Sequence, residues 1–183
     1  MAVEPQRGLT YEDLLEMFPD VDNVRRELID GELIVSPPPA TRHQRVVGDL
    51  LVELTLYARE HGGQAFTAPT GVFLSETNFV EPDVLFVTAD HLERIEAPFV
   101  RGAPDIVVEV SSPSTRRLEI VRKRELYERF GVPEYWYVDL DADRVEIYRL
   151  QVDQYGRPEL LERGDVLVTE LLPGFRLALD DLL

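Results

Sequence analysis

The 183-residue chain contains no cysteine, a single lysine and no apolar run near the length that crosses a membrane. Without thiols, both disulfide bonds and thiolate metal sites are excluded, which suits a reducing cytosol. Since no basic segment followed by an apolar segment opens the sequence, we expect a soluble, cytoplasmic protein. Hydrophobic residues make up 44% of the chain, enough to bury a core, and no repeat or low-complexity linker divides it.

Basic residues are scarce relative to acidic ones. The chain has 19 Lys and Arg against 35 Asp and Glu, a formal net charge of −16, so binding to DNA has to be local and weak. The densest basic stretch, RRLEIVRKRELYER, contains Arg116, Arg117, Arg122, Lys123, Arg124 and Arg129. A mixed-charge run of this kind is also typical of the solvated face of a helix, and that alternative stays open.

An acidic residue interrupts the apolar stretch PDIVVEVSSPS, residues 104–114. The β-branched run predicts a buried strand, whose alternation puts Glu109 on one face with Val107 and puts Val108 and Val110 on the other, expected to be core. A buried carboxylate is costly unless something compensates its charge. A metal ion, a nearby base or a partner such as arginine would each do so.

A second acid begins the apolar run in FVEPDVLFV, where Asp83 follows Pro82. If the two strands are neighbours, Asp83 and Glu109 can share a divalent cation, and hard oxygen ligands favour Mg²⁺ or Mn²⁺. The structural alternative is that Asp83 only caps the start of its strand.

Periodicity and turn residues predict an α/β domain with a mixed sheet flanked by helices. We expect a helix and hairpin over 9–36, a core over 41–150 and a β-rich extension over 151–183. The expected elements are a helix capped by Thr10 and Asp13, a hairpin at Asp30 and Gly31, a helix over 41–61 stopped by Gly62, strands near 71–75 and 83–87, a helix from Ser114 to Gly131, a hairpin around 141–143, and strands near 159–161 and 166–172.

Lys123 falls inside the apolar arc of the helix that follows the Glu109 strand, between Tyr127 and Phe130. Its ammonium group could therefore reach the carboxylates, although its stem could also snorkel past apolar neighbours. Two acids with a lysine suit metal-assisted phosphodiester hydrolysis, because the metal activates water and the ammonium group stabilises developing charge. His43 lies near the apolar stripe of the 41–61 helix, where a structural role is the commoner one.

The segments EPDVLFV, PDIVVEVSSPS and RKRELYERFGVPEYWYVD resemble the Uma-type family of restriction-endonuclease-like proteins, part of the PD-(D/E)XK nuclease superfamily. The resemblance spans about residues 27–149. It implies a central mixed sheet, Asp83 and Glu109 as metal-binding acids and Mg²⁺ or Mn²⁺ as cofactor, with the Val110 carbonyl as a further ligand.

The sequence departs from the superfamily signature at Ser111, which stands where a lysine is expected, and Lys123 looks like the migrated replacement. His43 and Glu27 also match the family pattern as auxiliary candidates, although we expect Glu27 to be an ordinary strand-edge residue. Similar sequences often have an aspartate at the position of Glu119, to which we assign no role.

We therefore expect a metal-dependent DNA endonuclease that uses Asp83, Glu109 and Lys123. One alternative is a protein that keeps the nuclease fold but no longer cuts and serves as an interaction module. Another is a carboxylate-pair hydrolase of a different substrate such as a glycoside, which leaves Lys123 without a task. The aromatic run EYWYV is expected in the core rather than as a base-stacking platform, and self-association is left open.

Overall fold

The computed structural model of the protein describes residues 8–19, 24–111 and 118–183, the last range without the side chains of 118–120. The expected helix cap Ser114, the basic residues Arg116 and Arg117 and the side chain of Glu119 therefore lie outside the described residues. Within the described part of the chain, no helix is long and apolar enough to cross a membrane.

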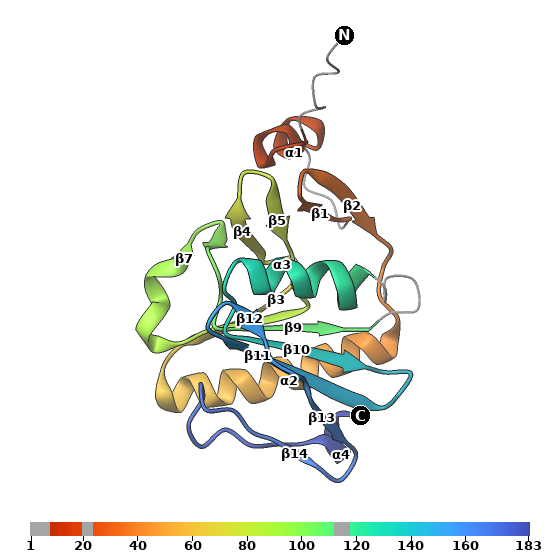
Figure 1. Cartoon of the computed structure of the whole chain (residues 1–183), viewed down its shortest axis with the longest axis vertical. Coiled ribbons are helices and arrows are strands. Elements are labelled where there is room, and N and C mark those ends of the chain that lie inside the picture. Colours follow the sequence, from red (N-terminus) through yellow and green to blue (C-terminus); the bar gives the residue numbers. More distant parts are fainter. Residues whose placement is uncertain (1–7, 20–23, 112–117) are drawn as a thin grey trace.

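The N-terminal part forms a mixed sheet, here called the hairpin sheet, which lies in the upper half of Figure 1. Its strand order is β2 (Glu32–Ser36), β1 (Arg25–Ile29), β5 (Asn78–Val80), β4 (Gly71–Ser75), β8 (Phe99–Arg101) and β7 (Ile95–Glu96). β1 and β2 are joined by Asp30 and Gly31, both with positive φ, as a tight hairpin turn requires. Helix α1 (Tyr11–Met17) covers this sheet and begins with the predicted capping box of Thr10 and Asp13.

The second sheet, here called the central sheet, is also mixed. Its order is β12 (Gln154–Tyr155), β11 (Arg144–Gln151), β10 (Glu134–Asp139), β9 (Ile106–Val110), β6 (Val84–Val87) and β3 (Gln64–Thr67), with β13 (Glu159–Glu162) also paired to β11. β9 runs parallel to β10 and antiparallel to β6. The mixed α/β fold is therefore as predicted, and β6 and β9 are neighbours.

Helix α2 (Thr41–His61) packs on one face of the central sheet through the predicted stripe, which includes Val46, Leu50 and Leu54. It stops at Gly62, whose φ of 85° few other residues adopt. The C-terminal segments β14 (Val166–Leu167), β15 (Leu177–Ala178) and α4 (Leu179–Leu182) add apolar residues to the same core. The strand expected over 166–172 is shorter than predicted.

The other face of the central sheet packs against the hairpin sheet, with a helical segment beside both (Figure 1). This segment starts as a π-helical turn, η2 (Leu118–Lys123), and continues as α3 (Arg124–Arg129). Leu126 and Tyr127 join Val107 of β9 and Ile29 of β1 in one core cluster. Both faces of β9 are thus buried: Val108 and Val110 lie in the core as expected, and the opposite face packs between the two sheets.

The remaining described helix, η1 (Ala89–Arg94), connects β6 to β7 and lies at the far end of β6 from Asp83. Its neighbour Asp105 accepts hydrogen bonds from the backbone and hydroxyl of Thr88 and contacts His91 at 2.6 Å. Asp105 therefore has a separate structural environment, away from the other acids singled out in the sequence.

Candidate active site

The pairing of β6 with β9 brings Asp83 and Glu109 together. Val84 is paired with Val108 and Leu85 with Val107 in this antiparallel ladder, so one further step places Asp83 opposite Glu109. The Val110 N–H donates to Asp83 Oδ2 at 2.8 Å, which holds the aspartate against β9. Both acids are buried.

Lys123 lies inside the molecule, as predicted. Its Nζ is 2.8 Å from Glu109 Oε1 and 2.8 Å from Glu27 Oε1, and the residue is 1% exposed. Tyr127, one helical turn further on, donates its hydroxyl to the same Glu109 oxygen at 2.7 Å. The helix that follows β9 therefore returns a cation and a hydroxyl to the acid in that strand.

Arg25 of β1 connects the carboxylates. Its guanidinium is 2.7 Å from Asp83 Oδ1, 3.4 Å from Glu109 Oε2 and 3.5 Å from Glu27 Oε1. It also donates to the Glu81 backbone carbonyl. The alternation along β1 points Arg25, Glu27 and Ile29 toward the central sheet, which explains why both charged residues enter the space between the sheets.

His43, near the start of α2, completes the contacts of Asp83 with a distance of 3.0 Å between Nε2 and Oδ2. Burial by itself would raise the pKa of Asp83, but the hydrogen bond from His43 and the charge of Arg25 outweigh it and lower that pKa to about 2. Asp83 is therefore ionised at neutral pH. His43 therefore lies beside the acids, and its auxiliary role stays a prediction.

The pKa values of Glu109 and Lys123 depend on both burial and neighbouring charges. Burial, together with the negative charges of Asp83 and Glu27, raises the pKa of Glu109 against the opposing effect of Lys123 and Arg25. Burial and Arg25 would lower the pKa of Lys123, but the surrounding carboxylates raise it, so the ammonium stays charged. In Glu27, by contrast, the charges of Arg25 and Lys123 outweigh burial and lower the pKa.

The arrangement, here called the buried charge cluster, contains the acids Glu27, Asp83 and Glu109 against the cations Arg25 and Lys123. One negative charge remains in excess when His43 is neutral, and Glu27 Oε2 is buried without a hydrogen-bond partner among the described residues. A further cation would balance both features. Within the described ranges, no three His, Asp or Glu side chains already form a metal-binding group, since the acids point at Arg25 and Lys123 instead.

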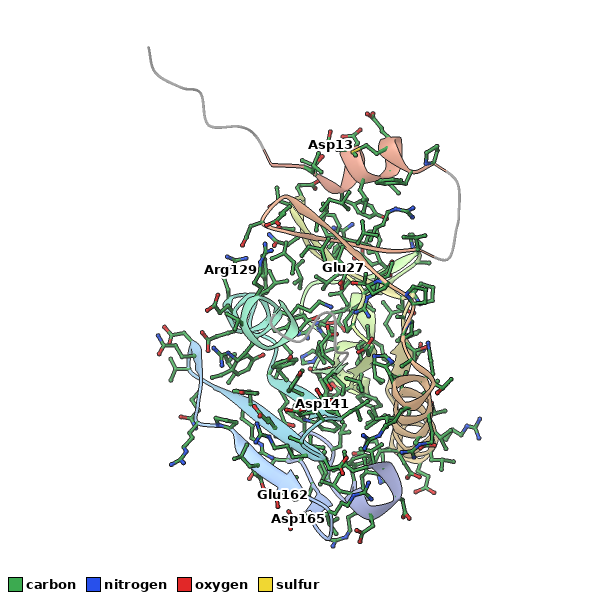
Figure 2. The ribbon with its side chains drawn as sticks, turned by 90° about the vertical axis from the view of Figure 1, so that its right-hand side faces the viewer. Asp13, Glu27, Arg129, Asp141, Glu162 and Asp165 are labelled. Carbon is green, nitrogen blue, oxygen red and sulfur yellow. The ribbon has the colours of Figure 1, made fainter. Side chains whose placement is uncertain are left out.

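Glu27 differs from its expected role. It was expected at a strand edge, but β1 lies between β2 and β5, and Glu27 is 1% exposed. Figure 2 shows it in the interior, below the hairpin. Sequence reasoning missed Arg25 and Tyr127 altogether, although the period-two pattern of β1 places Arg25 on the same face as Glu27. Ser111, in the position of the superfamily lysine, instead accepts a hydrogen bond from the Leu140 N–H.

The basic stretch on the same helix is largely engaged with other groups. Arg122 is 2.7 Å from Glu32, Arg129 is 2.6 Å from Asp30, and the Arg124 guanidinium lies over the Tyr148 ring. The aromatic residues Tyr135, Trp136 and Tyr137 are buried, which confirms their assignment to the core.

A cavity of about 260 Å³ opens beside the buried charge cluster. Its polar lining includes Arg25, His43, Glu81 and Asp83, and its apolar lining includes Val47. Burial raises the pKa of Glu81 to about 7, with the charge of Glu27 adding to this effect. Glu109 and Lys123 do not line the cavity, whereas Arg25 lines it and lies 3.4 Å from Glu109.

The mixed central sheet thus carries α2 on one face and the hairpin sheet with η2–α3 on the other, and two acids at its adjacent strands meet a lysine from the following helix. The chain belongs to the Uma2 family, whose model, described as "Putative restriction endonuclease", matches residues 11–180. No curated protein matches the chain. The fold resembles the crystal structure of a protein from Anabaena variabilis described as a "putative nuclease belonging to DUF820", with a TM-score of 0.79, 19% identity, and coverage of 95% of this chain and 97% of that one.

Proposed function

We propose that the protein is a divalent-metal-dependent endonuclease that hydrolyses phosphodiester bonds in DNA. The observation that carries this proposal is the convergence of Asp83, Glu109 and Lys123, from three different elements, at one buried position beside a cavity. Membership of a family described as restriction endonucleases supports the same reaction class.

Asp83 and Glu109 would hold Mg²⁺ or Mn²⁺, with the Val110 carbonyl as the expected additional ligand. When bound, such an ion polarises the phosphate and lowers the pKa of a bound water molecule. The excess negative charge of the cluster and the unpartnered oxygen of Glu27 fit an added cation. Lys123 keeps its positive charge next to Glu109 and would stabilise negative charge on the phosphate in the transition state.

A cleavage assay on plasmid and linear DNA tests the proposal. We expect Mn²⁺-dependent cleavage that Asp83→Asn and Glu109→Gln abolish and that Lys123→Arg reduces by about 100-fold or more, since a planar guanidinium cannot take the place of an ammonium group. Because the protein carries a net charge of −16, the assay belongs at low salt.

Asp105→Asn provides the matched control, because Asp105 is a buried acid beside the other end of β9 and contacts Thr88 and His91. This variant should cut as the parent does. Cleavage by Asp83→Asn at the parental rate would contradict the proposal, and a complete absence of cleavage in the parent would favour an interaction protein that retains the fold.

A further inference from the structure

The Arg25 guanidinium occupies the place where the proposed function puts a divalent ion. It contacts both carboxylates on which the proposed function places a divalent ion, at 2.7 Å from Asp83 and 3.4 Å from Glu109. Two cations cannot share this space without strong repulsion, since unit charges a few ångströms apart interact strongly in a poorly solvated site.

Arg25 also lies where the cavity meets the buried acids. Its side chain is 20% exposed and lines the cavity, whereas the side chains of Glu109 and Lys123 are 0% and 2% exposed and do not line it. Of the two acids, only Asp83 lines the cavity, so an ion that enters there meets Asp83 and the Arg25 guanidinium before it reaches Glu109.

Some contacts of Arg25 are loose, although its 2.7 Å contact with Asp83 and its hydrogen bond to the Glu81 carbonyl have to break for the guanidinium to move. Its Nε is buried without a hydrogen-bond partner among the described residues, and its distances to Glu109 and Glu27 are long for charge-assisted hydrogen bonds. The cavity offers room for the displaced side chain, and the acidic residue Glu81 lines it as well.

We propose that Arg25 is an internal counter-cation that competes with the divalent ion for the position between Asp83 and Glu109. In the metal-free protein it compensates the buried acids and closes the way from the cavity to Glu109. Ion binding displaces the guanidinium toward the cavity, where it becomes available to an anionic group of the substrate. This inference rests on the proposed function, because it takes Asp83 and Glu109 as the metal ligands.

Titration calorimetry with Mn²⁺ alone, on the full chain without DNA, tests the competition. Arg25→Gln should bind Mn²⁺ about 10-fold more tightly than the parent, because the ion no longer has to displace a charged competitor. Arg25→Lys keeps the charge but cannot bridge two carboxylates as a planar fork does, so its affinity should lie between the two.

Arg26→Gln is the matched control for the change in charge. Arg26 is the next residue of β1, points to the opposite face of the strand, and its guanidinium lies over the Phe18 ring at 4.1 Å from the ring centre. Its removal should change Mn²⁺ affinity much less. If Arg25→Gln and Arg26→Gln bind equally well, or if Arg25→Gln binds more weakly than the parent, competition by Arg25 is wrong.

Thermal unfolding covers the case in which Arg25→Gln is unstable. Without Arg25, three buried acids face Lys123 alone, so the midpoint temperature in EDTA should fall and Mn²⁺ should raise it more than in the parent. A smaller Mn²⁺-induced shift in Arg25→Gln than in the parent contradicts the proposal.

Different Mn²⁺-binding results distinguish failure of the competition by Arg25 from failure of the proposed metal site. Equal Mn²⁺ affinity of the parent and Arg25→Gln, with loss of binding in Glu109→Gln, overturns the competition and leaves the metal site in place. Absence of Mn²⁺ binding in every protein, including Arg25→Gln, overturns the metal site and the competition together.

Discussion

The hairpin β1–β2 and the helical segment η2–α3 are joined by ion pairs at two depths. At the surface, Arg122 pairs with Glu32 and Arg129 with Asp30, and all of these side chains are at least one-third exposed. Inside, Lys123 pairs with Glu27, and both are nearly inaccessible. Figure 2 shows the contrast, with Arg129 on the outer side of α3 and Glu27 in the interior.

The exposed ion pairs and the buried ion pairs contribute differently to stability. Exposed pairs gain little, because water solvates the separated charges almost as well. Buried pairs carry a desolvation penalty that their attraction only partly offsets, and apolar residues of similar volume would often serve stability as well or better. A net gain in stability therefore does not account for the buried charge cluster, which fits its proposed role in metal binding.

The largest expected effect comes from removing one charge of the buried layer. Lys123→Met keeps most of the side-chain volume but leaves Glu27 and Glu109 without their shared cation, so we expect a loss of about 3–5 kcal/mol in unfolding free energy. Urea denaturation in EDTA measures it. Arg124→Met, the next position of the helix, is the control and should lose less than about 1 kcal/mol, the typical worth of an exposed cation–π contact.

Urea denaturation of Glu109→Gln measures the effect of removing an acid, rather than a cation, from the buried charge cluster. This variant leaves two acids and two cations, so its loss of stability should be clearly smaller than that of Lys123→Met. Equal losses in both would mean that the hydrogen bonds, rather than the balance of charge, determine the stability of the cluster.

Lowering the pH should reduce the unfolding free energy by less than the loss of Lys123 does. Because the pKa of Asp83 is lowered to about 2 in the fold against about 3.9 in an unfolded chain, its ionised form stabilises the protein above pH 4 and this stabilisation is lost as the pH falls toward 2. Arg25, His43 and Lys123 are the positive or protonatable groups that favour its charge.

The stability difference between the parent and Asp83→Asn measures this contribution. From pH 6 to pH 2.5 it should change by roughly 2 kcal/mol, with the parent losing its relative advantage. Because the charge of Asp83 helps to raise the pKa of Glu109, the substitution also lowers the pKa of Glu109, and the measured difference contains this second effect. A difference that stays constant with pH would show that Asp83 is not stabilised in its charged form.

The smallest effect is expected at the surface. Arg129→Gln should change the unfolding free energy by about 0.5 kcal/mol or less, and the double variant with Arg122→Gln by about 1 kcal/mol or less, with the difference disappearing in high salt. Chemical denaturation at two salt concentrations measures this. A loss of unfolding free energy comparable to that of Lys123→Met would remove the distinction between exposed and buried ion pairs.

Local features of the fold were predictable because a few neighbouring residues suffice for them. The capping box at Thr10 and Asp13, the turn at Asp30 and Gly31, and the stop of α2 at Gly62 all follow from backbone preferences and short-range hydrogen bonds. The helix expected from Ser114 to Gly131 was taken to be regular, but its first described turn, η2, is π-helical. Nothing in the spacing of residues there signals the wider turn.

The site was predictable only in part. Asp83, Glu109 and Lys123 were identifiable because charged residues inside apolar patterns need compensation, and their contacts follow from neighbouring strands and the next helix. Arg25 lies 58 residues from Asp83 and 84 from Glu109 along the chain, so its role depends on how two sheets pack. Glu27 was misjudged for the same reason.

The sequence by itself therefore determined which residues carry charge into apolar segments, because hydrophobic periodicity is a property of neighbouring positions. Only the tertiary structure decided which cation meets which acid. That choice depends on the packing of the hairpin sheet against the central sheet, which buries Arg25 among three carboxylates and leaves Arg129 at the surface. Burial changes the strength of every one of these charge interactions, and the burial of a given side chain is a property of the whole fold.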